Sequence, residues 1–167
     1  IEYANGEINA SNAAVKMGKL LQIAAGQVKD DMGNVMSLDS SPRDERLWEI
    51  FEEGGKRKLV VFTAYRASVK HLVDYFTKKK VKVACIYGDV PQQTRAKHIQ
   101  DFQNGDLQVL ILQPQSTSHG ITLTASNVIV WYSLVPSGET HMQANGRITR
   151  AGQTRKQYII YLFGTQV

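Results

Sequence analysis

Five short runs of apolar residues are the feature that most constrains how this chain of 167 residues can fold. Each run is nearly continuous in Val, Ile, Leu, Phe and Tyr, which is typical of parallel strands whose two faces are both covered by helices. The five expected strands are residues 58–63, 81–87, 107–112, 127–132 and 158–163. We therefore expect an α/β fold of three layers, with a parallel central sheet flanked by helices.

Two helices are expected between the first three strands. In the first, Val69, Leu72, Val73 and Phe76 recur at the spacing of one apolar helix face. The second begins after Pro91, whose fixed backbone angle suits a helix start, and stops at Gly105. Strand-helix-strand units of this kind are expected to form right-handed crossovers.

The first third of the chain has a different character. A helix is expected over residues 13–23, a small hairpin around the acidic turn at residues 29–34, and a second helix from Ser41 to Gly54. We expect residues 1–55 to be a helical lead-in with a hairpin, packed on a lobe formed by residues 56–167. Because the length suits one compact unit, we expect a single domain overall.

Composition narrows the classes of partner and site. Twenty Lys and Arg against fifteen Asp and Glu give a net charge of +5, which favours a polyanionic partner. Cys85 is the only cysteine, which excludes an intramolecular disulfide and indicates a reducing, intracellular setting. The four histidines lack the spacing of metal ligands, so no metal site is expected. No apolar run is long enough to span a membrane, and we expect no membrane partner. Since the chain begins with Ile1, we also expect a fragment or a processed product.

Residues 143–153 form the most specific segment of the sequence. We expect them on a helix that begins near Ser137 and ends at Gly152, where Gln143, Arg147 and Arg150 would share one face at i, i+4 and i+7. Two guanidinium groups three residues apart can bind a phosphate through paired charged hydrogen bonds. Gly146 would leave room for close approach. An arginine pair on a helix more often makes surface salt bridges, but the whole pattern favours a phosphate site.

The pattern Q-x-x-G-R-x-x-R-x-G-Q resembles motif VI of superfamily-two helicases and translocases, and its Arg-Ala-Gly-Gln end is most similar to the Swi/Snf-type branch. Other segments are similar to further motifs of the family, in the same order and spacing. Residues 59–65 resemble motif IV, residues 86–90 with Arg95 and Phe102 resemble the "GxxxxxxR…F" segment, residues 116–129 resemble motif V, and residues 19–26 resemble the lead-in helix. Ser118-His119-Gly120 departs from the usual glycine pair, which suggests an unusual, phage-type member.

This resemblance implies the C-terminal RecA-like, P-loop NTPase-like lobe of a motor whose ATP site lies between two lobes. The implied partner is therefore the N-terminal RecA-like lobe of the same protein. By resemblance, Arg150 is an arginine finger toward the γ-phosphate of ATP and Arg147 is a second phosphate contact. Gln143 would help to order the site, together with Gly146, and Gly120 would lie near the ribose.

The resemblance also implies contacts with a nucleic-acid backbone. Ser116 and Thr117 would face that backbone, while Thr63 and Gly88 would contact phosphates through a hydroxyl and a main-chain amide. Such contacts carry no base-sequence specificity. DNA is the expected partner, with RNA less favoured, and the sequence leaves open translocation against strand separation and the polarity of movement.

Two parts of an ATPase are absent from the sequence. There is no G-x-x-x-x-G-K-[ST] phosphate loop and no D-E-x-H box, so Mg²⁺ would be held by the N-terminal lobe and this chain alone should not hydrolyse ATP. The alternative is a catalytically idle RecA-like module that binds nucleic acid or protein. A nicotinamide oxidoreductase is disfavoured because Gly88 stands alone in its loop. We expect a cytoplasmic or nuclear location, or the host cytoplasm for a phage protein.

Overall fold

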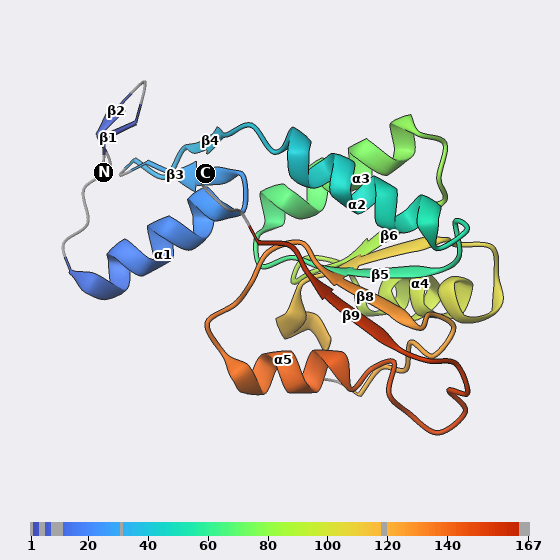
Figure 1. The fold of residues 1–167 in the computed structure, drawn as a ribbon. Coiled ribbons are helices and arrows are strands. Elements are labelled where there is room, and N and C mark those ends of the chain that lie inside the picture. The colour runs from blue at the N-terminus through green and yellow to red at the C-terminus, as the bar shows by residue number, and fades with distance from the viewer. Residues whose placement is uncertain (1, 4–5, 8–11, 31, 118–119, 164–167) are drawn as a thin grey trace.

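A five-stranded parallel sheet forms the centre of the protein (Figure 1). The computed structural model describes residues 2–3, 6–7, 12–30, 32–117 and 120–163. All five strands lie within the predicted runs, and their order across the sheet is β6-β7-β5-β8-β9. The expected α/β fold with a parallel sheet is confirmed. The strands are β5 (Leu59–Phe62), β6 (Val83–Ile86), β7 (Val109–Leu112), β8 (Val128–Trp131) and β9 (Tyr158–Tyr161).

Helices cover both faces of this sheet, so the fold has three layers (Figure 1). On one face lie α2 (Ser41–Glu53) and α3 (Arg66–Lys78), and on the other lie α4 (Gln92–Asn104) and α5 (Gly138–Asn145). A 3-10 turn, η1 (Pro114–Thr117), follows β7. No helix in the described part of the chain is both long and apolar enough to cross a membrane.

The central strand β5 explains why its apolar run is continuous. Leu59 and Val61 point into the core beneath α2 and α3, whereas Val60 and Phe62 point into the core on the α4 and α5 side. All four side chains are buried. A strand with two buried faces gains apolar burial at every position, which removes the polar alternation of a half-exposed strand.

The first third of the chain forms a small unit beside the carboxyl ends of the strands (Figure 1). It contains β1 (Glu2–Tyr3), β2 (Gly6–Glu7), α1 (Ala13–Ala24), β3 (Gln27–Lys29) and β4 (Val35–Ser37). The predicted helix and hairpin are confirmed, and Asp30 closes the hairpin turn by accepting from the Asn34 amide at 2.8 Å. No residue of α1 is buried, whereas α2 contributes core residues, namely Leu47, Ile50 and Phe51.

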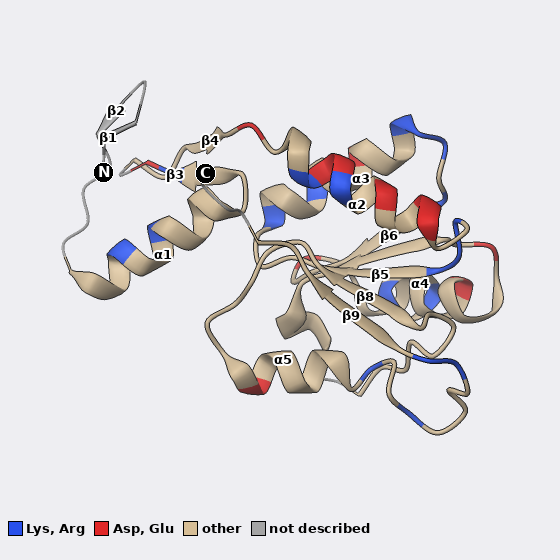
Figure 2. Ribbon diagram, viewed as in Figure 1, with Lys and Arg blue, Asp and Glu red and all other residues tan. Residues whose placement is uncertain are grey.

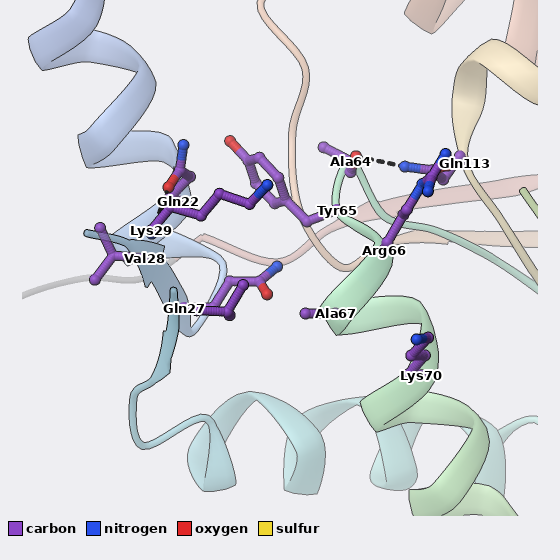
Figure 3. Close-up of a pocket in the computed structure, with 11 residues that line it drawn as sticks. Gln22, Gln27, Val28, Lys29, Ala64, Tyr65, Arg66, Ala67, Lys70 and Gln113 are labelled. Carbon is purple, nitrogen blue, oxygen red and sulfur yellow. Dashed lines mark hydrogen bonds between the residues drawn. The ribbon is translucent and has the colours of Figure 1, made fainter. Parts of the chain in front are cut away.

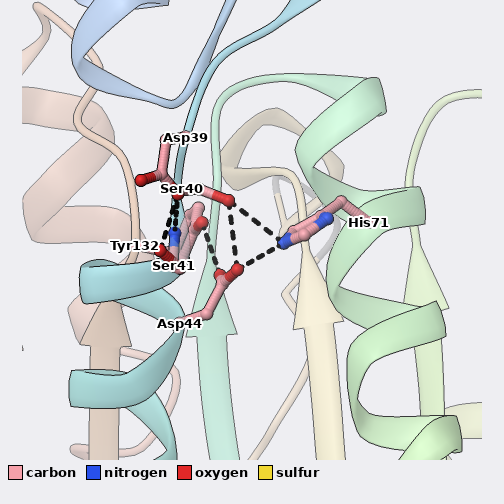
Figure 4. A network of polar contacts seen from close by, with 6 residues as sticks. All are labelled: Asp39, Ser40, Ser41, Asp44, His71 and Tyr132. Carbon is pink, nitrogen blue, oxygen red and sulfur yellow. Dashed lines mark hydrogen bonds and ion pairs between the residues drawn. The ribbon is translucent and has the colours of Figure 1, made fainter.

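A polar network ties α2 to α3 and to the end of β8 (Figure 4). The buried carboxylate of Asp44 accepts from the Tyr132 hydroxyl at 2.7 Å, from the Ser40 hydroxyl at 3.0 Å and lies 2.7 Å from Nε2 of His71. Burial and the Asp44 carboxylate raise the pKa of Tyr132. The hydrogen bond to Asp44 raises the pKa of His71, although partial burial opposes the increase. The network therefore fixes the start of α2 over the sheet.

Candidate nucleotide-binding site

The segment expected to carry the two phosphate-binding arginines is not one continuous helix. α5 ends at Asn145 with Gly146 as its cap, so the prediction of a helix to Gly152 was wrong. The Arg147 carbonyl, which a longer helix would use internally, accepts from the Leu123 amide at 2.9 Å. Burial of Ile148 favours this turn, because its side chain enters the core beside α4 and α5. Tertiary contacts thus end the helix about two turns before Gly152.

Arg150 nevertheless meets the segment that resembles motif V. Its Nη1 donates to the Gly120 carbonyl at 2.9 Å and to the Thr122 hydroxyl at 3.0 Å. Gly120 has a φ of +70°, a conformation that side chains rarely adopt. Since Arg150 remains exposed, its other guanidinium nitrogens can still reach a ligand.

Arg147 is the unusual member of the pair because it is only 8% exposed. Its Nε is buried and has no acceptor among the described residues. Burial, and secondarily the charge of Arg150, lowers the pKa of Arg147. Neither arginine forms an ion pair with a carboxylate in the described part of the chain. Figure 2 shows basic residues in the segment after α5, while the acidic residue of α5 lies in its first turn. An anion would complete this pair electrostatically.

Two further side chains stabilise this region. Nε2 of Gln153 donates to the carbonyls of Thr124 at 3.1 Å and Ser126 at 2.7 Å. Nη2 of Arg155 donates to the Thr124 carbonyl at 3.1 Å and the Ala125 carbonyl at 2.7 Å. Gln153 is the last residue of the recognised pattern, but its role was not predicted, and no sequence signal singled out Arg155.

The other nucleotide-site residues lie close in sequence to the arginines but do not all join them. Gln143 is exposed, and its Nε2 donates to Glu139 within the same helix at 2.9 Å. Because α5 ends at Asn145, Gln143 does not share a helical face with Arg147 and Arg150, which corrects that expectation. A Cβ on Gly146 would lie 3.3 Å from the Met142 carbonyl, so this glycine fits a tight helix end.

Two of the predicted nucleic-acid contacts are internal to the protein. Thr63 is fully buried, and its hydroxyl lies 2.8 Å from that of Ser133. Thr117 is 2% exposed, and its hydroxyl donates to the Pro114 carbonyl at 2.6 Å. The prediction that these hydroxyls face a phosphate backbone is therefore corrected, because an already bonded and buried hydroxyl is not accessible to an external ligand.

Ser116 and Gly88 remain available at the surface. Ser116 is partly exposed and Gly88 is exposed. Arg95 fixes the loop of Gly88 by donating to the carbonyls of Tyr87 at 2.9 Å, Gly88 at 2.8 Å and Val90 at 2.7 Å. The arginine of the "GxxxxxxR…F" segment thus has a structural role. The departure noted at residues 118–119 lies outside the described residues.

Comparison with known proteins identifies the family. Residues 42–152 match the helicase conserved C-terminal domain. The chain is 26% identical to an ATP-dependent RNA helicase, DBP3, of Meyerozyma guilliermondii, over 85% of this chain and 28% of that protein. It is 30% identical to the SWI/SNF-related matrix-associated actin-dependent regulator of chromatin subfamily A-like protein 1 of Drosophila melanogaster, over 64% of this chain and 14% of that protein.

A solved structure shows the same fold. The crystal structure of the C-terminal part of the Fun30 ATPase domain superposes with a TM-score of 0.66 at 20% identity, covering 71% of this chain and 40% of that one. This chain spans less than a third of the length of each of the two curated relatives described above. With its RecA-like sheet and the match over most of its length, the chain belongs to the helicase conserved C-terminal domain family and is a C-terminal lobe of the superfamily-two type.

Proposed function

We propose that this chain is the C-terminal motor lobe of an ATP-dependent DNA helicase or translocase of the Swi/Snf type. Its ATP site would be completed by an N-terminal lobe of the same protein. The observation that carries this proposal is the pair Arg147 and Arg150, which brings two positive charges together without a carboxylate partner among the described residues. A terminal phosphate is the kind of anion that such a pair binds best.

The donor set fits the phosphates of ATP. Arg150 uses Nη1 to hold Gly120 and Thr122, which leaves Nε and Nη2 as donors to an oxygen of the phosphate. Arg147 adds a second positive charge three residues away, although its Nε is itself buried. When bound, ATP supplies the phosphoryl group for transfer to water. Arg150 would then stabilise the negative charge that develops during transfer, an effect worth about a thousandfold or more in rate.

The metal belongs to the other half of the proposed site. No cluster of three or more His, Cys, Asp or Glu in the described ranges could hold a metal ion. Mg²⁺ is usually bound through carboxylates together with the phosphates of the nucleotide. We therefore assign the metal ligands to the N-terminal lobe.

DNA is the proposed nucleic acid because the Arg-Ala-Gly-Gln end of the arginine segment is most similar to the Swi/Snf branch. The Drosophila relative is named as SWI/SNF-related, and this name supports the proposal. RNA is the competing partner, since the Meyerozyma relative is named as an RNA helicase. Comparing the ATPase activity of the intact protein with duplex DNA, single-stranded DNA and RNA distinguishes these partners. Stimulation by RNA alone would refute the DNA assignment.

The assignment of Arg150 as an arginine finger is tested with the variants R150A and R150K of the intact protein. Both variants should lower nucleic-acid-stimulated ATPase activity by about a hundredfold or more, because lysine cannot reproduce the forked donors of arginine. R57A is the matched control, since Arg57 is an exposed arginine on the loop before β5. If R150A retains activity within about threefold of the unmodified protein, the finger assignment is wrong.

A further inference from the structure

A cavity of about 520 Å³ lies between α1, β3 and β4 of the small N-terminal unit and the start of α3 (Figure 3). Gln22 of α1 and Lys29 of β3 line one side, and Tyr65 and Lys70 line the other. Its volume falls within the range of about 300 to 1,000 Å³ that is usual for small-ligand sites. The cavity is therefore large enough to hold a nucleotide.

The charged side chains that the structure describes in the wall of this cavity are all positive. Among the described residues, Lys29, Arg66 and Lys70 contribute charge to its lining, and no described Asp or Glu does. The guanidinium of Arg66 is already paired with Asp89, with nitrogen to oxygen distances of 2.7 and 2.9 Å. Lys29 and Lys70 have no carboxylate partner in the described part of the chain. Two ammonium groups thus remain to attract an anion.

The uncharged side chains of Gln22 and Tyr65, which line the cavity, suit the sugar and the base of a nucleotide. Figure 3 shows the side chains of Gln22, Lys29 and Tyr65 converging from opposite sides of the cavity. The Gln22 carbonyl oxygen accepts from the Lys29 amide at 2.9 Å, which leaves the Gln22 NH₂ group as a donor. Tyr65 presents an aromatic ring, on which a base can stack. Burial raises the pKa of Tyr65, so its hydroxyl remains a neutral donor.

The two sides of the cavity are held in place by buried contacts. Gln27 donates to the Ser68 hydroxyl at 2.8 Å in a buried hydrogen bond between β3 and α3. Val28 is fully buried next to it. Gly26 allows the chain to turn closely past Ser40, because its φ is +82° and a Cβ there would lie 3.0 Å from the Ser40 Cβ. The site is thus largely formed before any ligand binds.

The cavity is also distinct from the arginine pair. Ala64 and Gln113, which follow β5 and β7, place it at the carboxyl ends of the strands. The chain after α5 instead leads into the amino end of β9, where the Tyr158 amide donates to the Asn127 carbonyl at 2.8 Å. Arg147 and Arg150 belong to that returning segment. A ligand in the cavity would therefore not occupy the proposed ATP site.

We infer that this cavity binds one nucleoside phosphate unit, with the phosphate between Lys29 and Lys70 and the nucleoside against Tyr65. The inference rests on the proposed function in one respect, since a nucleic-acid motor supplies strands as the source of that unit. A free nucleotide is the other source of the same chemistry. The N-terminal hairpin would accordingly be part of the binding surface rather than only a connection to the lobe.

Binding is measured with a labelled oligo(dT) of about 12 nucleotides, by fluorescence anisotropy, and with dTMP and inorganic phosphate as competitors. The double variant K29A/K70A should bind the oligonucleotide about tenfold more weakly, because two phosphate contacts are lost. K16A/K97A is the matched control, since it removes the same charge from exposed positions of α1 and α4. Equal weakening by both double variants would refute the site, and so would K29A/K70A binding both the oligonucleotide and dTMP as tightly as the unmodified protein.

Competition by dTMP and by inorganic phosphate shows whether the bound unit comes from a nucleic-acid strand or from a free nucleotide. Displacement of the oligonucleotide by dTMP, at concentrations where inorganic phosphate fails, supports recognition of a nucleoside phosphate. Phosphate that competes as well as dTMP overturns the nucleoside half of the inference. Binding of dTMP that K29A/K70A abolishes, with oligonucleotide binding unchanged, assigns the site to a free nucleotide.

Two variants of Tyr65 keep the test decisive if K29A/K70A does not fold. Y65A should weaken oligonucleotide binding by about tenfold through lost stacking, while Y65F should retain most of it because the ring remains. Thermal unfolding of each variant checks that the fold is intact. The proposed function has its own readout, the ATPase activity of R150A. If R150A keeps full ATPase activity while K29A/K70A loses oligonucleotide binding, the finger assignment fails and the cavity site stands.

Discussion

The guanidinium of Arg150 reaches back to Gly120, with Nη1 donating to the glycine carbonyl at 2.9 Å. The same nitrogen also donates to Thr122, and the Leu123 amide donates to the Arg147 carbonyl. Side-chain and main-chain bonds thus join two segments that are about thirty residues apart in the sequence. Their relative position sets where both arginines can meet a phosphate.

Gly120→Ala tests this connection through the backbone. Gly120 has a φ of +70°, and a Cβ there would meet no atom of the described residues within 4 Å, so the expected cost is backbone strain. We expect the free energy of unfolding to fall by about 1 kcal/mol, as measured by urea denaturation. Gly138→Ala is the control, because that glycine has neither a positive φ nor a close neighbour. An equal loss in both variants would contradict the strain explanation.

Arg147→Met should separate stability from function. The buried Nε of Arg147 lacks an acceptor in the described part of the chain, so an apolar side chain of similar length removes an unfavourable charge. We expect the free energy of unfolding to stay constant or rise by about 1 kcal/mol, while ATPase activity of the intact protein falls.

The control for that experiment is Arg43→Met. The Arg43 guanidinium lies 5.3 Å from the centre of the Tyr132 ring, a favourable cation–π contact. Its loss should lower the free energy of unfolding by about 1 kcal/mol. If Arg147→Met destabilises the protein as much as Arg43→Met, the Arg147 guanidinium is satisfied inside the fold and its assignment to a phosphate loses its main support.

Thr63→Val tests whether this residue is a structural or a ligand-binding group. The variant removes the 2.8 Å hydrogen bond between the two hydroxyls and leaves the Ser133 hydroxyl with only the Ala64 amide as a partner, so we expect a loss of about 1 kcal/mol in the free energy of unfolding. Thr63→Ser keeps a hydroxyl and should lose less. Oligonucleotide affinity should be unchanged in both variants, and a selective loss of affinity in Thr63→Val would restore the original prediction of a phosphate contact.

The His71–Asp44 contact should make stability depend on pH. Because the hydrogen bond to Asp44 raises the pKa of folded His71 above its ordinary value of 6.5, the folded state favours the protonated imidazole. This stabilisation is fully present below pH 6.5 and is lost as the pH rises through the raised pKa. The loss should be under about 1 kcal/mol, since water screens a half-exposed imidazole. His71→Gln should remove this pH dependence in urea denaturation, and His98→Gln should not. Persistence of the slope in His71→Gln would assign it to another group.

The sequence predicts the layers of this fold with little ambiguity. Continuous apolar runs such as residues 59–62 are typical of strands whose two faces are both buried, and that pattern is local. The resemblance of residues 143–153 to motif VI likewise depends on residue types and spacing alone. For this reason the sheet, the flanking helices and the two candidate arginines follow from local sequence patterns.

Only the tertiary structure decided which of these groups can reach a ligand. A helix pattern through Gly152 is locally reasonable, but burial of Ile148 and the bond from Leu123 to Arg147 end α5 at Asn145. Thr63 likewise has the residue type of a phosphate contact, yet its hydroxyl is used by Ser133, 70 residues away. Burial and long-range hydrogen bonds depend on how distant segments pack, and packing energies of this kind leave no periodic signal in the sequence.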